Sequence, residues 1–150
     1  MKVVIALGSN LGDREANLNR AEAELSEVIR IDAISSFIDT DPVGGPEQPD
    51  YLNAVLVGDC DREPEELLQL LLQIESRLGR VRDVKWGPRT LDLDLIVAGD
   101  LLIDSEELQL PHPRAHERAF VLAPWLEIDP DGYIPGQGRI ADLLAELNTD

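Results

Sequence analysis

The chain has 150 residues, the length of a single domain, and 43% of them are hydrophobic, which is enough for a packed core. Thirteen Lys and Arg against thirty Asp and Glu give a formal net charge of −17, which disfavours binding to nucleic-acid phosphates and anionic membranes. With one cysteine, Cys60, no internal disulfide forms, and no apolar run has the length of a membrane span. We therefore expect one cytoplasmic domain over residues 1–150.

Strand and helix patterns alternate from the N-terminus. Continuous apolar runs predict strands, and apolar residues at spacings of three and four predict helices. Pro64 stands at a favoured helix start and Gly79 at a favoured helix stop. We expect strands at Val3–Leu7, Ile31–Ile38, Leu52–Cys60 and Leu91–Ala98, and helices at about 14–29 and 64–78.

Two loops and a C-terminal region complete the pattern. The Pro- and Gly-rich residues Thr40–Asp50 and the residues Arg80–Thr90 are predicted loops. Gly99 and Asp100 predict a turn from the fourth strand into Leu101–Ile103, as an edge hairpin. Short helices are expected at Arg114–Ala123 and Ile140–Leu147. The order β-α-β-β-α-β is typical of an α+β, ferredoxin-like sandwich, in which helices pack on an antiparallel sheet.

Two aspartates on the fourth predicted strand are the sharpest chemical feature. Asp92 and Asp94 share one strand face, while Leu91, Leu93 and Leu95 point to the core. Two carboxylates this close repel each other unless a cation lies between them, and Mg²⁺ prefers such oxygen ligands together with phosphates. The alternative is the solvated face of an amphipathic strand.

The loop before these aspartates concentrates the basic residues of a very acidic chain. Five of them fall within thirteen residues, where an even spread would place about one. Arginine forks beside carboxylates suit a metal–polyphosphate site, although surface salt bridges are the alternative. Trp86, in the same loop, either stacks on a flat ring or anchors the loop to the core. The basic residues are Arg77, Arg80, Arg82, Lys85 and Arg89.

Other polar residues stand in apolar surroundings or near one another. Glu75 lies near the apolar face of the second helix and either binds an arginine or ligand hydroxyl or reaches water. Asn53 shares a strand face with Tyr51 and either binds the edge of a heterocycle or pins the preceding loop. His112 and Arg118 are candidate phosphate contacts, and zinc at His112 and His116 is disfavoured because no third ligand lies nearby.

Four sequence blocks resemble the 6-hydroxymethyl-7,8-dihydropterin pyrophosphokinase (HPPK) family. The most specific is Trp86–Asp94, preceded by Gly79–Arg82; the others stand in the family's order. The resemblance runs from Lys2 to about Pro130 and implies the ferredoxin-like fold. It also implies pyrophosphoryl transfer from ATP to the pterin hydroxymethyl group, with AMP as the second product, in folate biosynthesis. The other blocks are Ala6–Gly12, Gln48–Ala54 and Pro111–Pro113.

The resemblance also implies a role for each matching residue. Asp92 and Asp94 would hold two Mg²⁺ ions, and Arg80 and Arg89 would act with them in catalysis. Both loops would close over the substrates. The implied ATP contacts are Leu68, Glu75, Arg80, Arg82, Arg89, Leu95, His112 and Arg118. The implied pterin contacts are Thr40, Pro42, Val43, Tyr51, Asn53, Trp86, Asp92 and Phe120.

Two other functions share part of this sequence pattern. A nucleotidyltransferase also uses Gly-Ser and Asp-x-Asp, but there the two usually lie in one short strand–helix unit, unlike Ser9 and Asp92 here. A non-catalytic nucleotide-binding module of ferredoxin-like fold would bind ATP without consuming it. The expected partners are ATP and the pterin, with neither nucleic acid nor membrane, and we expect a monomer.

Overall fold

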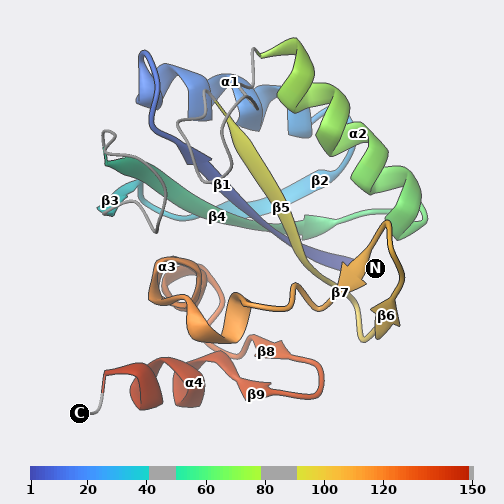
Figure 1. The fold of residues 1–150 in the computed structure, drawn as a ribbon, viewed down its shortest axis with the longest axis vertical. Helices are drawn as coiled ribbons and strands as arrows, with labels where there is room; N and C mark the ends of the chain where they lie inside the picture. The colour runs from blue at the N-terminus through green and yellow to red at the C-terminus, as the bar shows by residue number, and fades with distance from the viewer. Residues whose placement is uncertain (41–49, 79–90, 149–150) are drawn as a thin grey trace.

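The computed structural model describes residues 1–40, 50–78 and 91–148 (Figure 1). Most of both predicted loops therefore lies outside the described residues. The larger elements are β1 (Lys2–Ser9), α1 (Arg14–Leu25), β2 (Arg30–Ile34), β3 (Ile38–Thr40), β4 (Tyr51–Asp59), α2 (Pro64–Arg77), β5 (Asp92–Ala98), α3 (Ala119–Ile128) and α4 (Ile140–Leu147). The short elements are β6 (Ile103–Asp104), β7 (Gln109–Leu110), a 3₁₀ turn (Ala115–Glu117), β8 (Tyr133–Ile134) and β9 (Gly138–Arg139).

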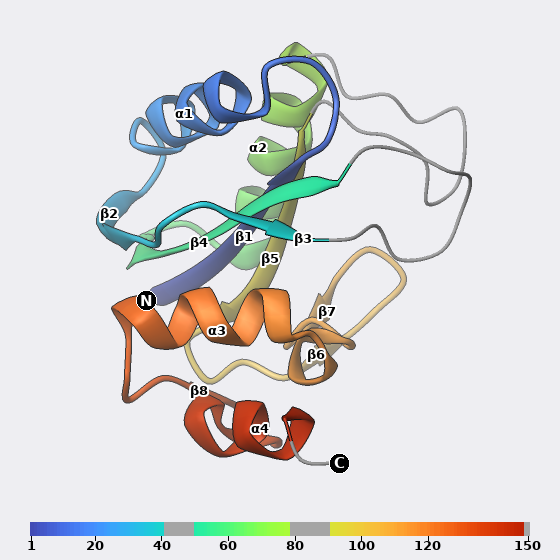
Figure 2. The same cartoon turned by 90° about the vertical axis from the view of Figure 1, so that its left-hand side faces the viewer.

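One antiparallel sheet organises the molecule. Its strand order is β2-β4-β1-β5, and β3 pairs with β4 beyond the end of β2. Helices α1 and α2 cover one face, and α3 crosses the other with α4 beneath it (Figures 1 and 2). The predicted antiparallel sheet with two helices on one face is confirmed. No helix in the described ranges is both long and apolar enough to cross a bilayer.

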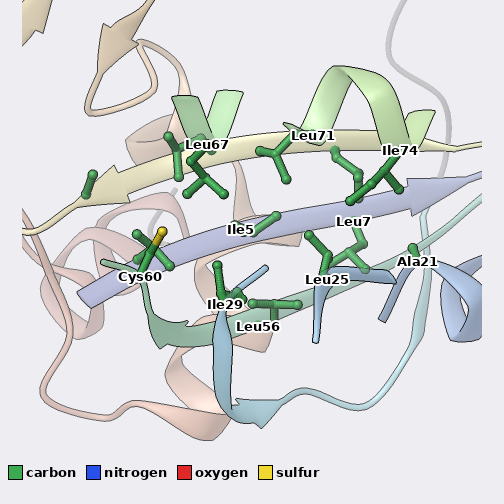
Figure 3. Packing of buried hydrophobic residues seen from close by; sticks show 14 of the residues in the cluster. Ile5, Leu7, Ala21, Leu25, Ile29, Leu56, Cys60, Leu67, Leu71 and Ile74 are labelled. Atoms are coloured by element: carbon green, nitrogen blue, oxygen red, sulfur yellow. The ribbon is translucent and has the colours of Figure 1, made fainter. Parts of the chain in front are cut away.

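The first core cluster fills the space between the sheet and helices α1 and α2 (Figure 3). Alternate residues of β1 enter it, and the same alternation from Leu91 into β5 buries the three predicted leucines, each at most 5% exposed. Burial of each such side chain contributes roughly 1.5–3 kcal/mol. The Asp13 side chain accepts from the Ala16 N–H and caps α1. These contacts fix β1 and β5 side by side at the centre of the sheet.

A second cluster lies on the opposite face, where α3 packs against β4. Trp125 of α3 is 1% exposed and donates from Nε1 to Asp129. The cluster covers the end of this face that carries Val4, Val57 and Val97. The other end of the same face carries polar side chains, and the candidate site lies there.

Three predicted elements differ from the structure by more than a shift of one or two residues at their ends. The first helix ends at Leu25, because the chain turns at Ser26 before β2. The helix expected at Arg114–Ala123 is a 3₁₀ turn followed by α3, because Arg118 has an extended backbone between them. The strand expected at Ile31–Ile38 is divided into β2 and β3.

The predicted edge hairpin is also wrong in its partner. The turn is present, with Gly99 at φ 55° and the Leu101 N–H donating to the Ala98 carbonyl. The chain then leaves the main sheet, and Ile103 pairs with Leu110 in a separate two-stranded sheet. The partner of β6 is therefore β7, a strand that the spacing around Gly99 does not reveal.

Candidate active site

The aspartate pair lies at the start of β5, on the face opposite α1 and α2. Leu91, Leu93 and Leu95 point into the first core cluster, so Asp92 and Asp94 point away from it and remain partly exposed. The predicted alternation is therefore confirmed. Both aspartates have interactions elsewhere in the chain, so neither carboxylate stands alone.

Strand β1 separates the aspartates from the polar residues of β4. Gly8 pairs with Asn53 on one side and with Asp92 on the other, and Ala6 pairs with Asp94. Because neighbouring strands lie about 4.8 Å apart, Asn53 and Asp92 are about 10 Å apart along this row. The small residues Ala6 and Gly8 of β1 leave a shallow surface between the two groups, a role that the sequence alone did not predict.

The side chains of Asn53 and Tyr51 on β4 pack closely against Gly8. A Cβ at this position would lie 3.1 Å from Asn53 Oδ1 and 3.3 Å from Tyr51 Cδ1. A side chain at position 8 would therefore have to displace Asn53 or Tyr51 by a few tenths of an ångström. An alternation of small residues along a central strand is the sequence signal that could have revealed this shallow surface.

Asn53 also holds the neighbouring strand. Its side chain is buried, and Nδ2 donates to the Thr40 Oγ1. Thr40 pairs directly with Tyr51, so three predicted pterin contacts share one patch of the sheet face. Of the two interpretations of Asn53, the structure shows the one in which its side chain holds the preceding segment in place, through Thr40. A contact with a heterocycle stays a prediction.

Glu75 does not reach water. It is 2% exposed on α2, and its Oε2 accepts from the Leu93 N–H at 2.8 Å. The strand β5 is the last strand of the sheet order, so its outer edge has no strand partner in the described residues. The carboxylate therefore holds the backbone between Asp92 and Asp94. A contact of Glu75 with ATP stays a prediction.

His112 follows β7, where the chain comes back to β5, the strand that carries Asp92 and Asp94. Its N–H donates to the Ile96 carbonyl at 2.8 Å, where a bulge shifts the pairing of β1 with β5. Burial lowers the pKa of His112 to about 4; the charges of Arg118 and Arg114 act in the same direction, and that of Asp92 opposes them. The imidazole is therefore neutral at pH 7, and its Nδ1 accepts from the Arg114 N–H at 3.3 Å.

The remaining predicted residues divide into three groups. Arg118 places its guanidinium carbon 5.5 Å from the Phe120 ring centroid, at the start of α3. Leu68 and Leu95 belong to the first core cluster or pack against it. Outside the described residues lie Pro42, Val43, Arg80, Arg82, Trp86 and Arg89.

Comparisons with known proteins identify the family of this chain. A family model described as 7,8-dihydro-6-hydroxymethylpterin-pyrophosphokinase (HPPK) matches residues 4–130. This chain belongs to the HPPK family. The 2-amino-4-hydroxy-6-hydroxymethyldihydropteridine pyrophosphokinase of Bacillus subtilis is 48% identical over 126 residues, which are 83% of this chain and 75% of that protein. The enzyme of the same name from Mycobacterium bovis is 43% identical over 159 residues, covering 97% and 84%.

Solved structures support the HPPK fold. Two HPPK-DHPS crystal structures match with TM-scores of 0.75 and 0.73 at 10% and 13% identity; the second is from Plasmodium falciparum. Each match covers 97% of this chain and 43% of the larger one, so this chain spans less than half of those proteins. The α+β, ferredoxin-like class predicted from the sequence is confirmed.

Proposed function

We propose that this chain transfers the pyrophosphoryl group of ATP to the hydroxymethyl group of 6-hydroxymethyl-7,8-dihydropterin, a step of folate biosynthesis. Its membership of a pyrophosphokinase family supports this activity and makes the chain a transferase. The observation that carries the site is the row in which Gly8 separates Asn53 from Asp92. A flat polar ring bound beside Asn53 and Tyr51 would lie next to a polyphosphate bound at Asp92 and Asp94.

The proposed reaction exchanges one oxygen on the β-phosphorus for another. The hydroxymethyl oxygen bonds to the β-phosphorus, and the bond from that phosphorus to the α,β-bridging oxygen breaks. AMP leaves with the bridging oxygen, the β- and γ-phosphates move together, and the hydroxyl proton is released. Arg80 and Arg89 would stabilise the charge that develops on the phosphates.

The carboxylates fit a magnesium site. Asp92 and Asp94 share one face and stay partly exposed, and Mg²⁺ usually takes one or two carboxylates and fills its shell with water and phosphate. No larger group of His, Cys, Asp or Glu that could hold a metal occurs within residues 1–40, 50–78 and 91–148. Two bound Mg²⁺ ions would neutralise the triphosphate and lower the hydroxyl pKa.

Other residues would bind and orient the two substrates. Arg118 and the neutral His112 would donate to the nucleotide phosphates, because an imidazole whose Nδ1 accepts a hydrogen bond carries its proton on Nε2. Thr40, Tyr51 and Asn53 would contact the pterin edge, and Phe120 would stack on the ring with Trp86. Exclusion of water by the two loops would prevent ATP hydrolysis.

The test of this function follows the nucleotide products. Purified protein is mixed with Mg²⁺, ATP and 6-hydroxymethyl-7,8-dihydropterin, and the nucleotides are separated by chromatography. We expect AMP only when the pterin is present. ADP would indicate an ordinary kinase, and release of free pyrophosphate would favour a nucleotidyltransferase. Bound but unconsumed ATP would indicate the non-catalytic binding module instead.

Neutralising one aspartate tests the metal assignment. Asp92→Asn keeps the shape of the side chain and removes a charged Mg²⁺ ligand, so we expect turnover to fall by about 10³-fold or more. Asp61→Asn, an exposed aspartate beyond the far end of β4, is the matched control and should leave turnover unchanged. An Asp92→Asn rate within a few-fold of the original would contradict a metal role for this residue.

We further propose that the chain acts as a monomer in the cytoplasm. Its charge of −17 opposes self-association by mutual repulsion, and its only cysteine, Cys60, is buried and forms no disulfide. Light scattering after gel filtration tests the oligomeric state. A mass near the 16.6 kDa of one chain is expected.

A further inference from the structure

The strand that carries Thr40 has an irregular start. Strand β4 is continuous, but its partner is divided into β2 and β3 by three residues. In β2, Ile34 pairs with Leu56, and in β3, Ile38 pairs with Asn53. An unbroken antiparallel ladder would bring residue 37 opposite Asn53, so the connection contains one residue more than a regular strand.

This extra residue decides which side chain faces the substrate side. A regular ladder continuing from Ile34 would place Asp39 opposite Tyr51, and in the structure Thr40 is there. A slip of one residue moves every side chain of a strand to the other face of the sheet. Asp39 instead lies on the opposite face, where its Oδ1 accepts from Arg14 Nη1 at 2.7 Å.

Ser35 keeps the ladder bonded while the register changes. Its N–H donates to the Val55 carbonyl, and its hydroxyl accepts from the Val55 N–H, each at 2.9 Å. The hydroxyl thus takes the place of the backbone carbonyl that a regular pair would supply. Ser35 is 4% exposed, so without this hydroxyl the buried Val55 N–H would lose its acceptor.

The neighbouring Ser36 is the extra residue, and α3 holds it. The Ser36 N–H donates to Glu127 Oε1 at 2.9 Å, and its hydroxyl donates to Oε2 at 2.7 Å. These two hydrogen bonds lower the pKa of Glu127 below its ordinary value of 4.5. Both oxygens of one carboxylate are therefore committed to the bulged residue.

We propose that Ser35, Ser36 and Glu127 are positioning residues that lock the register of β3, so that Thr40 and not Asp39 faces the substrate side. This inference rests on the proposed function, because Thr40, Tyr51 and Asn53 form the proposed pterin edge. In the slipped register a carboxylate would stand beside Tyr51, in place of a hydroxyl bonded to Asn53. Pterin binding would weaken while the nucleotide side on β5 stayed intact.

The test removes the Ser35 hydroxyl and the Glu127 carboxylate, and then compensates by deleting Ser36. In the double variant Ser35→Ala/Glu127→Gln, we expect KM for the pterin to rise about tenfold, which is the size of effect that the loss of one hydrogen bond produces. KM for ATP should stay within about twofold. Deleting Ser36 in the same background removes the extra residue, so a regular ladder again pairs Thr40 with Tyr51. That deletion should restore the pterin KM. Glu107→Gln, an exposed glutamate near β7, is the control and should change neither KM.

A second measurement reads the register without any activity. NMR cross-peaks between β3 and β4 should join Tyr51 to Thr40 in the original chain, to Asp39 in the double variant, and to Thr40 again after the deletion. Glu127→Gln alone changes an exposed group and keeps the fold, so it should raise the pterin KM even if the double variant unfolds.

Several outcomes would overturn the proposal. These are unchanged cross-peaks with an unchanged pterin KM, equal losses for both substrates, or a folded deletion variant that does not recover. An original chain that makes no AMP would instead overturn the proposed function, and the cross-peaks would still decide the register.

Discussion

His112 shows how burial and neighbouring charges together set the protonation state of one residue in the site. It is partly buried, and Arg118, Arg114 and Asp92 all act on its pKa, which burial lowers to about 4. Because the ordinary value is 6.5, the unfolded chain binds a proton between pH 6.5 and pH 4 that the folded chain does not. In that window His112 lowers stability as the pH falls, and its contribution is constant again below the folded pKa.

Two substitutions should move the His112 pKa in opposite directions. Arg118→Gln removes a positive charge that disfavours the imidazolium, so the pKa should rise. Asp92→Asn removes the negative charge that favours it, so the pKa should fall further. The imidazole C–H resonances followed by NMR against pH report both shifts. Shifts of the same sign in the two variants would show that His112 does not sense both groups.

At the scale of the elements, α2 contacts β5 through one buried carboxylate, that of Glu75. Glu75 Oε2 accepts a hydrogen bond from the Leu93 N–H, on an edge of the sheet where the described part of the chain supplies no further strand. Glu75→Gln keeps an acceptor oxygen, and Glu75→Met has a similar shape without one. Leaving a buried N–H unpaired costs about 1–3 kcal/mol, so the Met variant should unfold at lower urea concentration than the Gln variant. Equal midpoints for the two variants would mean that this hydrogen bond adds no stability.

The elements also show what the sequence could predict. The face of Asp92 and Asp94 followed from the leucines that alternate with them, because strand periodicity is a local property. The division of β2 from β3 did not, since it depends on a hydroxyl at Ser35 and on Glu127, a residue 91 positions away from Ser36. Likewise, the partner of β6 depends on where the chain returns after Gly99, and no local pattern records that.

At the scale of the whole molecule, the two faces of the sheet have different tasks. The face under α1 and α2 is largely apolar and holds the strands together. The other face is covered by α3 at one end and carries the polar row Asn53–Gly8–Asp92 at the other. Stability and proposed chemistry therefore share the same strands, since side chains alternate between the faces.

The charge of the whole chain opposes this compact arrangement. A formal charge of −17 on 150 residues produces repulsion that weakens as salt shortens the Debye length, from roughly 30 Å at 0.01 M to below 8 Å above 0.15 M. Surface ion pairs such as Lys2–Asp129 and Arg14–Asp39 lose attraction in the same range, but each contributes only about 0–1 kcal/mol. Repulsion should therefore dominate, and Tm measured at pH 7.5 should rise by a few degrees between about 0.01 and 0.3 M NaCl. KCl should act equally, since screening depends on ionic strength and not on the cation. A Tm that falls with added salt would show that the ion pairs outweigh the net repulsion.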